Sequence, residues 1–387
     1  MRSRTRSLAL CLRRWLAPGR APQTGTTATT RLRAAASTRA GLVLALLAAG
    51  CESADPSGLP PPPVFNLDVR GDTLFVALGP MGSVAVVDLD AWKVAGTLAL
   101  STKYQPHHLS VSPDRRRIGV GAPAIDLSGG HAGHTGHAAD PAGGALYILD
   151  SQKGDVLAQG LPGGTAHNLA FVDDTRVGYA LMESGRVVLA AAADLQPSAE
   201  VAVGAAPLEV SASSVGLLVA NSGSGSISVV SPPGPDSTPP AVSATLPVGM
   251  NPIAAWLGSG NRAYVTSESD KKLIALALAE RKAEPAVTLP GQPGQALEVG
   301  GPTGELWVAL EDQGKTLVLG AADLAVKGEI VVGKKPHGLC LSARGYTVFL
   351  TDEADGRVYS IDVRTRAVLR SLYVGGAPNG IVFRAAL

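Results

Sequence analysis

The sequence predicts an all-β protein, a single seven-bladed β-propeller made of four-stranded antiparallel blades. First, the chain of 387 residues contains 46 Gly and 28 Pro, a composition that favours a turn-rich β protein over a helical bundle. Second, short apolar or alternating runs separated by Gly, Asp and Asn indicate strands joined by tight turns. Third, units of about forty residues repeat from Val64 onward, and a four-strand unit of that length is typical of a propeller blade.

Residues 1–50 are expected to form a lipoprotein-type signal peptide. Arginines between residues 31 and 39 precede an apolar run over 41–50, an order that is typical of a secretion signal. The run is too short to span a membrane, because a spanning helix needs about 20 residues. The segment Leu47-Ala-Ala-Gly-Cys51 resembles the bacterial lipobox, in which the cysteine carries the lipid, although Ala48 stands where the lipobox usually has Leu. Cleavage at the same place without lipidation is the alternative.

Residues 51–63 are expected to be a tether between that signal and a folded domain over 64–387. Pro60–Pro63 are four consecutive prolines, which impose a polyproline II conformation and make the segment a semi-rigid spacer. We therefore expect an extracytoplasmic protein, in the periplasm or at the outer surface, that is held at a membrane through a lipidated Cys51.

Charge and cysteine usage argue against several classes of protein. Residues 1–50 hold nine Arg and no acidic residue, so removing them leaves 33 − 9 = 24 basic against 32 acidic residues, a net charge of −8. A basic nucleic-acid binder is therefore not expected. Cys11, Cys51 and Cys340 form no Cys-x-x-Cys motif, which argues against a zinc ribbon or an attached c-type haem. Cys340 lies in an apolar strand-like run and is expected to be buried. Since no Walker loop or dinucleotide fingerprint is present, no nucleotide cofactor is expected.

A Val-Gly-x-x-Pro marker sets the register of the repeat. Four complete copies occur, at 203–207, 248–252, 332–336 and 374–378. With degenerate copies included, the units are anchored at residues 106, 166, 207, 252, 293, 336 and 378, which are 60, 41, 45, 41, 43 and 42 residues apart. An insertion over 122–143 accounts for the one long interval. The Gly of the marker is expected to supply a positive φ angle, and the Pro to preset the backbone of the next strand.

The anchors predict seven blades, whose innermost strands start near residues 64, 106, 166, 207, 252, 293 and 336. In the last full unit the four strands are expected at 337–341, 347–350, 357–361 and 369–374. Residues 378–387 add one further strand of the inner type, which is expected to pair with the first blade and to close the ring. The pattern does not decide which terminus supplies which strand of that blade.

Short motifs in the repeats carry a family resemblance. The segments Leu218–Asn221, Ala263–Ser267 and Pro336–Gly338 resemble the YVTN-type β-propeller repeats of bacterial extracytoplasmic proteins. The resemblance covers residues 64–387 and implies the propeller fold. It implies no single activity, since relatives include binding proteins, lactonases and subunits of redox enzymes, and function in such folds lies in the loops and the channel.

Propeller topology places all seven histidines on one face of the ring, which we call the top face. Each inner strand starts there, and the loop between the second and third strands of a blade returns there. Three histidines lie three residues apart on the Gly-rich insertion, and the others follow the anchors of three units. The expected metal ligands are His107, His108, His131, His134, His137, His167 and His337. Because neutral imidazole suits Zn, Cu and Ni, the cofactor expected is Zn or Cu.

Carboxylates in the other loops of the top face would favour a cation. They are Glu183, Glu268, Asp270, Glu311, Asp312, Asp352, Glu353 and Asp355. The alternative is that the insertion is a solvated loop and that each histidine after an anchor only packs on its turn.

The function expected is that of a lipid-anchored binding or scaffold module, which holds a transition metal and meets a protein partner or a small ligand at its top face. No nucleophile elbow or other hydrolase signature marks an enzyme. One alternative is a lactonase-like hydrolase, for which His337, Arg357 and Glu183 would supply the reactive groups. The other is a protein-interaction platform without a small ligand.

Overall fold

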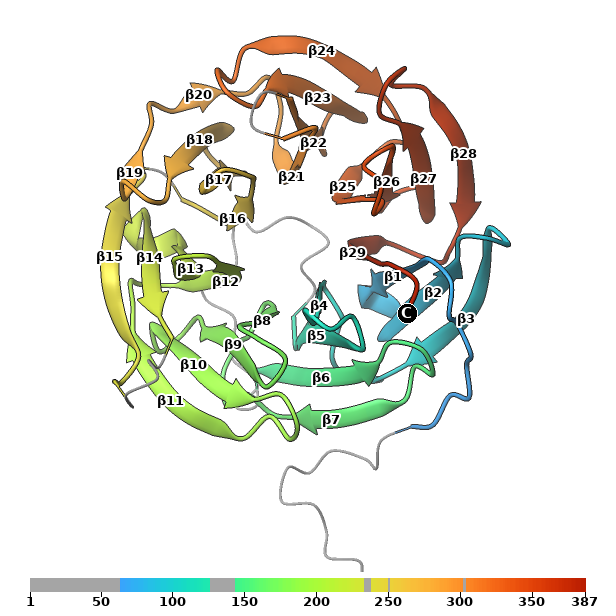
Figure 1. Ribbon diagram of the computed structural model, residues 1–387, viewed down its shortest axis with the longest axis horizontal. Coiled ribbons are helices and arrows are strands. Elements are labelled where there is room, and N and C mark those ends of the chain that lie inside the picture. Colours follow the sequence, from blue (N-terminus) through green and yellow to red (C-terminus); the bar gives the residue numbers. More distant parts are fainter. Residues whose placement is uncertain (1–62, 126–142, 233–237, 250, 302–303) are drawn as a thin grey trace, which may run out of the picture. The chain divides into compact units, whose positions relative to one another are not determined.

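The computed structural model describes residues 63–125, 143–232, 238–249, 251–301 and 304–387, which form seven antiparallel sheets around a central axis (Figure 1). The prediction of an all-β, seven-bladed propeller is therefore confirmed. Helical structure in the described residues consists of two short 3-10 turns, η1 (Gly79–Met81) and η2 (Ser222–Ser224). Neither has the length or the apolar character needed to cross a bilayer.

The blades follow one another along the chain, and their strands are given from the axis outward. Blade 1 has β29 (Pro378–Arg384), β1 (Thr73–Leu78), β2 (Ser83–Asp88) and β3 (Lys93–Ala99). Blade 2 has β4 (His108–Val111), β5 (Arg117–Pro123), β6 (Gly144–Asp150) and β7 (Val156–Gly160). Blade 3 has β8 (Leu169–Phe171), β9 (Arg176–Leu181), β10 (Arg186–Ala191) and β11 (Pro197–Ala202). Blade 4 has β12 (Pro207–Ser213), β13 (Gly216–Asn221), β14 (Ser226–Ser231) and β15 (Ala241–Pro247).

The outermost strand of blade 5 is divided into two short pieces. Blade 5 has β16 (Ala254–Leu257), β17 (Arg262–Ser267), β18 (Lys272–Ala277), β19 (Lys282–Ala283) and β20 (Val287–Thr288). Blade 6 has β21 (Pro293–Val299), β22 (Glu305–Leu310), β23 (Lys315–Gly320) and β24 (Val326–Val331). Blade 7 has β25 (Pro336–Leu341), β26 (Thr347–Asp352), β27 (Arg357–Asp362) and β28 (Val368–Tyr373).

Some predictions fall on segments that the structure does not describe. Residues 1–62, with the expected signal peptide, the lipidation site Cys51 and most of the tether, lie outside the described residues. Most of the insertion 122–143 does too, including all three of its histidines, His131, His134 and His137. These features stay predictions.

The ring closes through the C-terminal strand. β29 pairs antiparallel with β1 and contacts β25 of blade 7 and β4 of blade 2, so it is the innermost strand of blade 1. The expected pairing of this strand with the first blade is confirmed. The expected inner strand at residue 64 is wrong, because residues 63–72 contain no strand. The inner position that they would fill is occupied by β29.

Residues 64–70 instead form a strap across the turn between β6 and β7. The amides of Leu67 and Val69 donate to the carbonyls of Lys153 and Gln152, each at 3.1 Å. The alternating apolar pattern that predicted a strand consists of Phe65, Leu67 and Val69. These side chains pack on the seam between blades 1 and 2. Apolar alternation therefore indicated burial here but not sheet pairing.

Arg384, in β29, joins the strap to the closing strand. This guanidinium is fully buried and donates to the carbonyls of Val69 at 2.6 Å and Gly71 at 2.7 Å. It also donates to the Thr73 hydroxyl at 2.9 Å and to the Ser151 carbonyl at 3.2 Å. A single side chain thus links both ends of the propeller to blade 2.

The hydrophobic core is divided among the seams between neighbouring blades. In the described part of the chain, each of the seven seams holds its own cluster of buried aliphatic and aromatic side chains. At the seam of blades 1 and 2, for example, the cluster includes Phe75 and Tyr147. Cys340 lies in the cluster between blades 7 and 1, buried and with a free thiol, as predicted.

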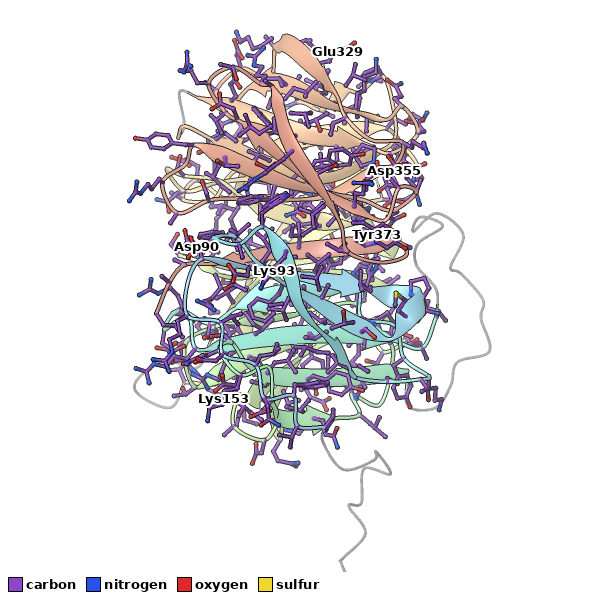
Figure 2. The ribbon with its side chains drawn as sticks, turned by 90° about the vertical axis from the view of Figure 1, so that its right-hand side faces the viewer. Asp90, Lys93, Lys153, Glu329, Asp355 and Tyr373 are labelled. Atoms are coloured by element: carbon purple, nitrogen blue, oxygen red, sulfur yellow. The ribbon has the colours of Figure 1, made fainter. Side chains whose placement is uncertain are left out.

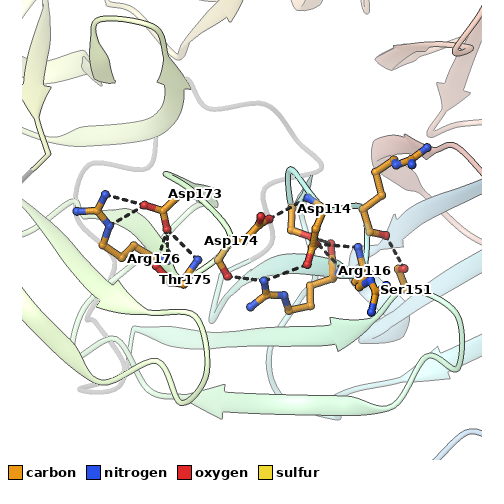
Figure 3. Close-up of polar contacts among 10 residues, drawn as sticks. Asp114, Arg116, Ser151, Asp173, Asp174, Thr175 and Arg176 are labelled. Carbon is orange, nitrogen blue, oxygen red and sulfur yellow. Dashed lines mark hydrogen bonds and ion pairs between the residues drawn. The ribbon is translucent and has the colours of Figure 1, made fainter. Parts of the chain in front are cut away.

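The two faces of the ring are distinct. Figure 2 views the propeller from the side, with Asp355 and Tyr373 of the top face on one side and Asp90 and Lys153 of the opposite, bottom face on the other. Turns of neighbouring blades are linked at the bottom face, where the amide of Asp114 donates to Asp174 Oδ1 at 2.8 Å (Figure 3). The strap crosses the bottom face, whereas the inner strands start at the top face.

The marker glycines differ in conformation. Gly249, Gly333 and Gly375 have positive φ angles of 63°, 71° and 132°, as predicted. Gly204 does not belong to this group. In that copy Ala206 has a positive φ angle of 47°, as does Ala377 in the copy that contains Gly375.

Candidate metal centre

The inner strands begin within three residues of the predicted anchors, and their first residues meet around the axis at the top face. Two positions of the repeat therefore surround the channel. The first, directly after each anchor, holds His107, His167, Leu208, Ile253, Gly294, His337 and Asn379. The second, one residue further on, holds His108, Asn168, Glu209, Ala254, Gln295, Gly338 and Gly380.

Three histidines of blades 2 and 3 form a buried cluster. His107 lies 4.6 Å from His108 and 4.5 Å from His167 between ring centroids, and His108 and His167 are 5.0 Å apart. Their exposed fractions are 4%, 6% and 1%. One ring nitrogen of each lies within 4.8 Å of those of the other two. We call these three residues the histidine cluster.

Glu209 of β12 reaches the histidine cluster from blade 4. Its Oε1 lies 3.0 Å from His108 Nε2 and 3.3 Å from His167 Nδ1, and the residue is only 2% exposed. Burial alone would raise the pKa of this carboxyl, but His108 and His167 outweigh burial and hold the pKa well below its usual range. Glu209 is therefore a carboxylate. It is absent from the set of ligands predicted above, although it occupies the same repeat position as His108.

His337 of blade 7 lies beside the histidine cluster but has a different partner. Its ring centroid is 6.0 Å from that of His107 and 5.8 Å from that of His108. His337 Nδ1 is 2.6 Å from Glu311 Oε1. Burial alone would lower the pKa of His337, but Glu311, helped by Glu353 and Glu268, raises it to about 9. At neutral pH His337 is therefore a cation, and a metal ion would have to displace its proton before binding.

Three carboxylates surround His337 on the side away from the histidine cluster. Glu268, Glu311 and Glu353 directly follow β17, β22 and β26 and are 3%, 3% and 6% exposed. Glu353 forms an ion pair with Lys335 at 2.5 Å and accepts a hydrogen bond from the amide of Asn379. The histidine cluster and Glu209 thus belong to blades 2 to 4, whereas the ion pairs of His337 and Glu353 belong to blades 6 and 7. Asn379 was also not among the predicted site residues, although it occupies the same repeat position as His107.

The other predicted carboxylates stabilise turns at the top face. Asp352, for instance, accepts the backbone amide of Lys335 at 2.8 Å. The remaining four and their partners are Glu183 with Thr165, Asp270 with Asn251, Asp312 with Gln292 and Asp355 with Lys334. The residues of the lactonase alternative also have separate partners, since Arg357 donates to Ser371 at 3.0 Å.

The histidine cluster with Glu209 is a donor set that suits Zn²⁺ or Cu²⁺. Imidazole nitrogens and carboxylate oxygens are common ligands of both ions, and three protein nitrogens with one oxygen complete a tetrahedron. Zn–N bonds of about 2.0–2.1 Å correspond to nitrogens about 3.3 Å apart. Because the cluster's nitrogens lie within 4.8 Å of one another, the side chains would move inward by roughly 1 Å around an ion.

No family model matches the sequence, and no curated protein matches it. Solved structures do resemble the fold. The periplasmic gluconolactonase PpgL of Pseudomonas aeruginosa is 17% identical with a TM-score of 0.63, over 82% of this chain and 99% of that one. AztD of Citrobacter koseri, in its apo form, is 12% identical with a TM-score of 0.58, over 83% of this chain and 100% of that one. The dihydro-heme d1 dehydrogenase NirN is 15% identical with a TM-score of 0.56, over 84% of this chain and 78% of that one. At these identities the similarity establishes a shared propeller fold.

Proposed function

We propose that this propeller binds a transition-metal ion, Zn²⁺ or Cu²⁺, in its channel through the histidine cluster and Glu209. The observation that carries the proposal is the burial of three imidazoles whose nitrogens lie within 4.8 Å of one another. Binding of one ion would engage all three imidazoles at once.

We also propose that the protein works outside the cytoplasm, anchored through a lipidated Cys51. The basic and apolar segments before Cys51 support secretion. One protein of similar fold, PpgL, is described as periplasmic. In this setting the propeller would be a metal-binding or scaffold module at the cell envelope.

The proposal is tested by metal titration of the chelator-treated protein. We expect one ion of Zn²⁺ or Cu²⁺ to bind per chain at pH 7 in isothermal titration calorimetry. Binding should weaken below about pH 6, because protons compete for the imidazoles. His167→Gln and Glu209→Gln should each weaken binding by more than about 100-fold, because the loss of even an outer-shell partner has effects of 10–100-fold.

His337→Gln is the matched control, because it changes a neighbouring histidine that is paired with Glu311. Its metal affinity should stay within about threefold of the parent's, a difference below 1 kcal/mol. A triple variant of His131, His134 and His137 tests the part of the prediction that lies outside the described residues. If the parent binds no ion more tightly than millimolar, or if the His167 and His337 variants bind equally well, the proposed centre is wrong.

A lactonase-like hydrolase is the second candidate, supported by the similarity of the fold to that of PpgL. The separate partners of His337, Arg357 and Glu183 do not support a reactive trio of those residues. Measuring glucono-lactone hydrolysis by the metal-loaded parent and by His167→Gln tests this candidate. Absence of hydrolysis by the parent would exclude it, and equal rates would exclude the histidine cluster as its site.

A further inference from the structure

A cavity of about 270 Å³ lies along the inner strands, next to the candidate metal centre. His108 and Glu209 line one end of it, and Val111, Phe171 and Ala212 line it further along the same strands. Because the inner strands run from the top face to the bottom face, the cavity extends from the metal centre towards the bottom of the channel. An enclosed space of 150 Å³ accommodates benzene, so this cavity has room for a small organic molecule.

Two side chains of the cavity wall have fixed orientations, Trp256 and Gln295. The Trp256 indole donates its N–H to the Thr266 hydroxyl at 3.0 Å and lies 6.2 Å from the ring of His108, so it offers an oriented aromatic surface. Gln295 Oε1 accepts the amide of Leu339 at 2.9 Å. This bond fixes the orientation of the Gln295 side-chain amide and leaves its NH₂ group as a donor on the cavity wall.

The metal would supply the anion-binding group at the end of the cavity. A divalent ion beside Glu209 would place positive charge there, and both Zn²⁺ and Cu²⁺ accept a further oxygen ligand. Further along, apolar side chains such as Leu109 and Phe171 share the wall with polar ones such as Ser110, Asn168 and Ser211.

We propose that the metal-loaded protein binds a small organic carboxylate in this cavity. The carboxylate would face the metal centre and the NH₂ group of Gln295, and its apolar body would lie against Trp256 and Phe171. This inference rests on the proposed function, because it needs an ion at the histidine cluster.

The test uses benzoate as probe, with uncharged benzamide as its matched control. Zn²⁺ binding is measured first, and benzoate is then titrated into Zn²⁺-loaded and metal-free protein by calorimetry and tryptophan fluorescence. We expect benzoate to bind the loaded protein with a Kd below about 1 mM, which corresponds to roughly 0.5 kcal/mol per non-hydrogen atom. Binding to the metal-free protein, and binding of benzamide, should be at least about tenfold weaker.

Two variants test the residues. Gln295→Glu keeps the acceptor for Leu339 and replaces the donor with a negative charge, so it should weaken benzoate binding at least about tenfold and leave Zn²⁺ binding no weaker. Trp256→Phe keeps an aromatic ring and should remove the fluorescence response, whereas Trp92→Phe, in another seam, should not.

The outcomes separate this inference from the proposed function. If Zn²⁺ binds but benzoate does not, the carboxylate site is wrong and the metal centre stands. If benzoate binds equally well with and without Zn²⁺, the proposal that the carboxylate site depends on the metal is wrong. If Zn²⁺ does not bind, both proposals fail. Unchanged benzoate binding by Gln295→Glu would overturn the placement of the carboxylate.

Discussion

At the scale of single residues, the channel separates histidines of two kinds. His108 and His167 share one carboxylate, Glu209, whereas His337 is paired with Glu311 and has its pKa raised to about 9. One metal ion at that place would engage both imidazoles together with the carboxylate. An imidazole in its own ion pair is suited to stay protonated and to stabilise the fold.

The His337–Glu311 pair should make the metal-free protein less stable at alkaline pH. Since its folded pKa of about 9 lies above the unfolded value of 6.5, its contribution is full below pH 6.5 and is lost as the pH rises through about 9. We expect the free energy of unfolding to fall by on the order of 2–3 kcal/mol between pH 6.5 and 9.5. Urea unfolding at a series of pH values measures this.

Glu311→Gln should lose less than half as much stability over the same pH range, because the main partner of His337 is gone. Glu329→Gln is the control, since Glu329 forms an ion pair on the surface and its side chain is 51% exposed. This control should lose as much unfolding free energy over this pH range as the parent. An equal loss in Glu311→Gln and in the parent would contradict the assignment of the pH dependence to this pair.

The sequence was informative about the candidate site because the repeat gives each residue a register. His107, His108 and His167 were predicted to lie on one face, and the structure brings them together. Glu209 occupies the register of His108, and comparing all units at that position would have found it. The partner of each histidine could not be predicted, because the partners come from other blades and depend on packing across the axis.

At the scale of the elements, the marker turn shows how one repeat position can differ in its surroundings. An added Cβ on Gly333 would lie 1.9 Å from Asp352 Oδ2, which accepts the amide of Lys335. On Gly249, at the equivalent position, nothing lies within 4 Å of an added Cβ. Both glycines have positive φ angles, so the backbone strain is shared and only the collision differs.

The two glycines therefore make a matched pair of variants. Gly249→Ala should destabilise the protein by about 1 kcal/mol, the cost of a left-handed alanine. Gly333→Ala should destabilise it by at least about 3 kcal/mol, since the carboxylate must also move away from the amides it accepts. Thermal unfolding measures both, and equal melting temperatures would show that the contact with Asp352 is unimportant.

At the scale of the whole molecule, stability depends on seven seams and one closure. The blade count could be predicted because the units recur at regular intervals. The origin of the inner strand of blade 1 could not, because the segment after Val64 and the segment 378–387 are both apolar and compete for one position. The C-terminal segment supplies the strand because it pairs with β1 and follows directly on blade 7.

Substitution of Arg384 should strongly destabilise this closure. Arg384→Met would leave the carbonyls of Val69, Gly71 and Ser151 without their donor, and we expect a loss of about 3 kcal/mol or more. Arg70→Met is the control, because the Arg70 side chain is 74% exposed and forms an ion pair with Asp68 at the surface. It should leave the stability close to that of the parent. Chemical denaturation compares the two, and a similar small effect of both would contradict the role of Arg384.

The same arrangement determines how the molecule would carry a mechanical load. A pull on the chain before residue 63 reaches the strap first, and the strap passes it through Arg384 to the last strand of the chain. The load would act on the bottom face, along the junction of the two ends of the propeller. The histidine cluster at the top face lies outside that path, so under such a load the channel would stay undistorted until the closure itself gives way.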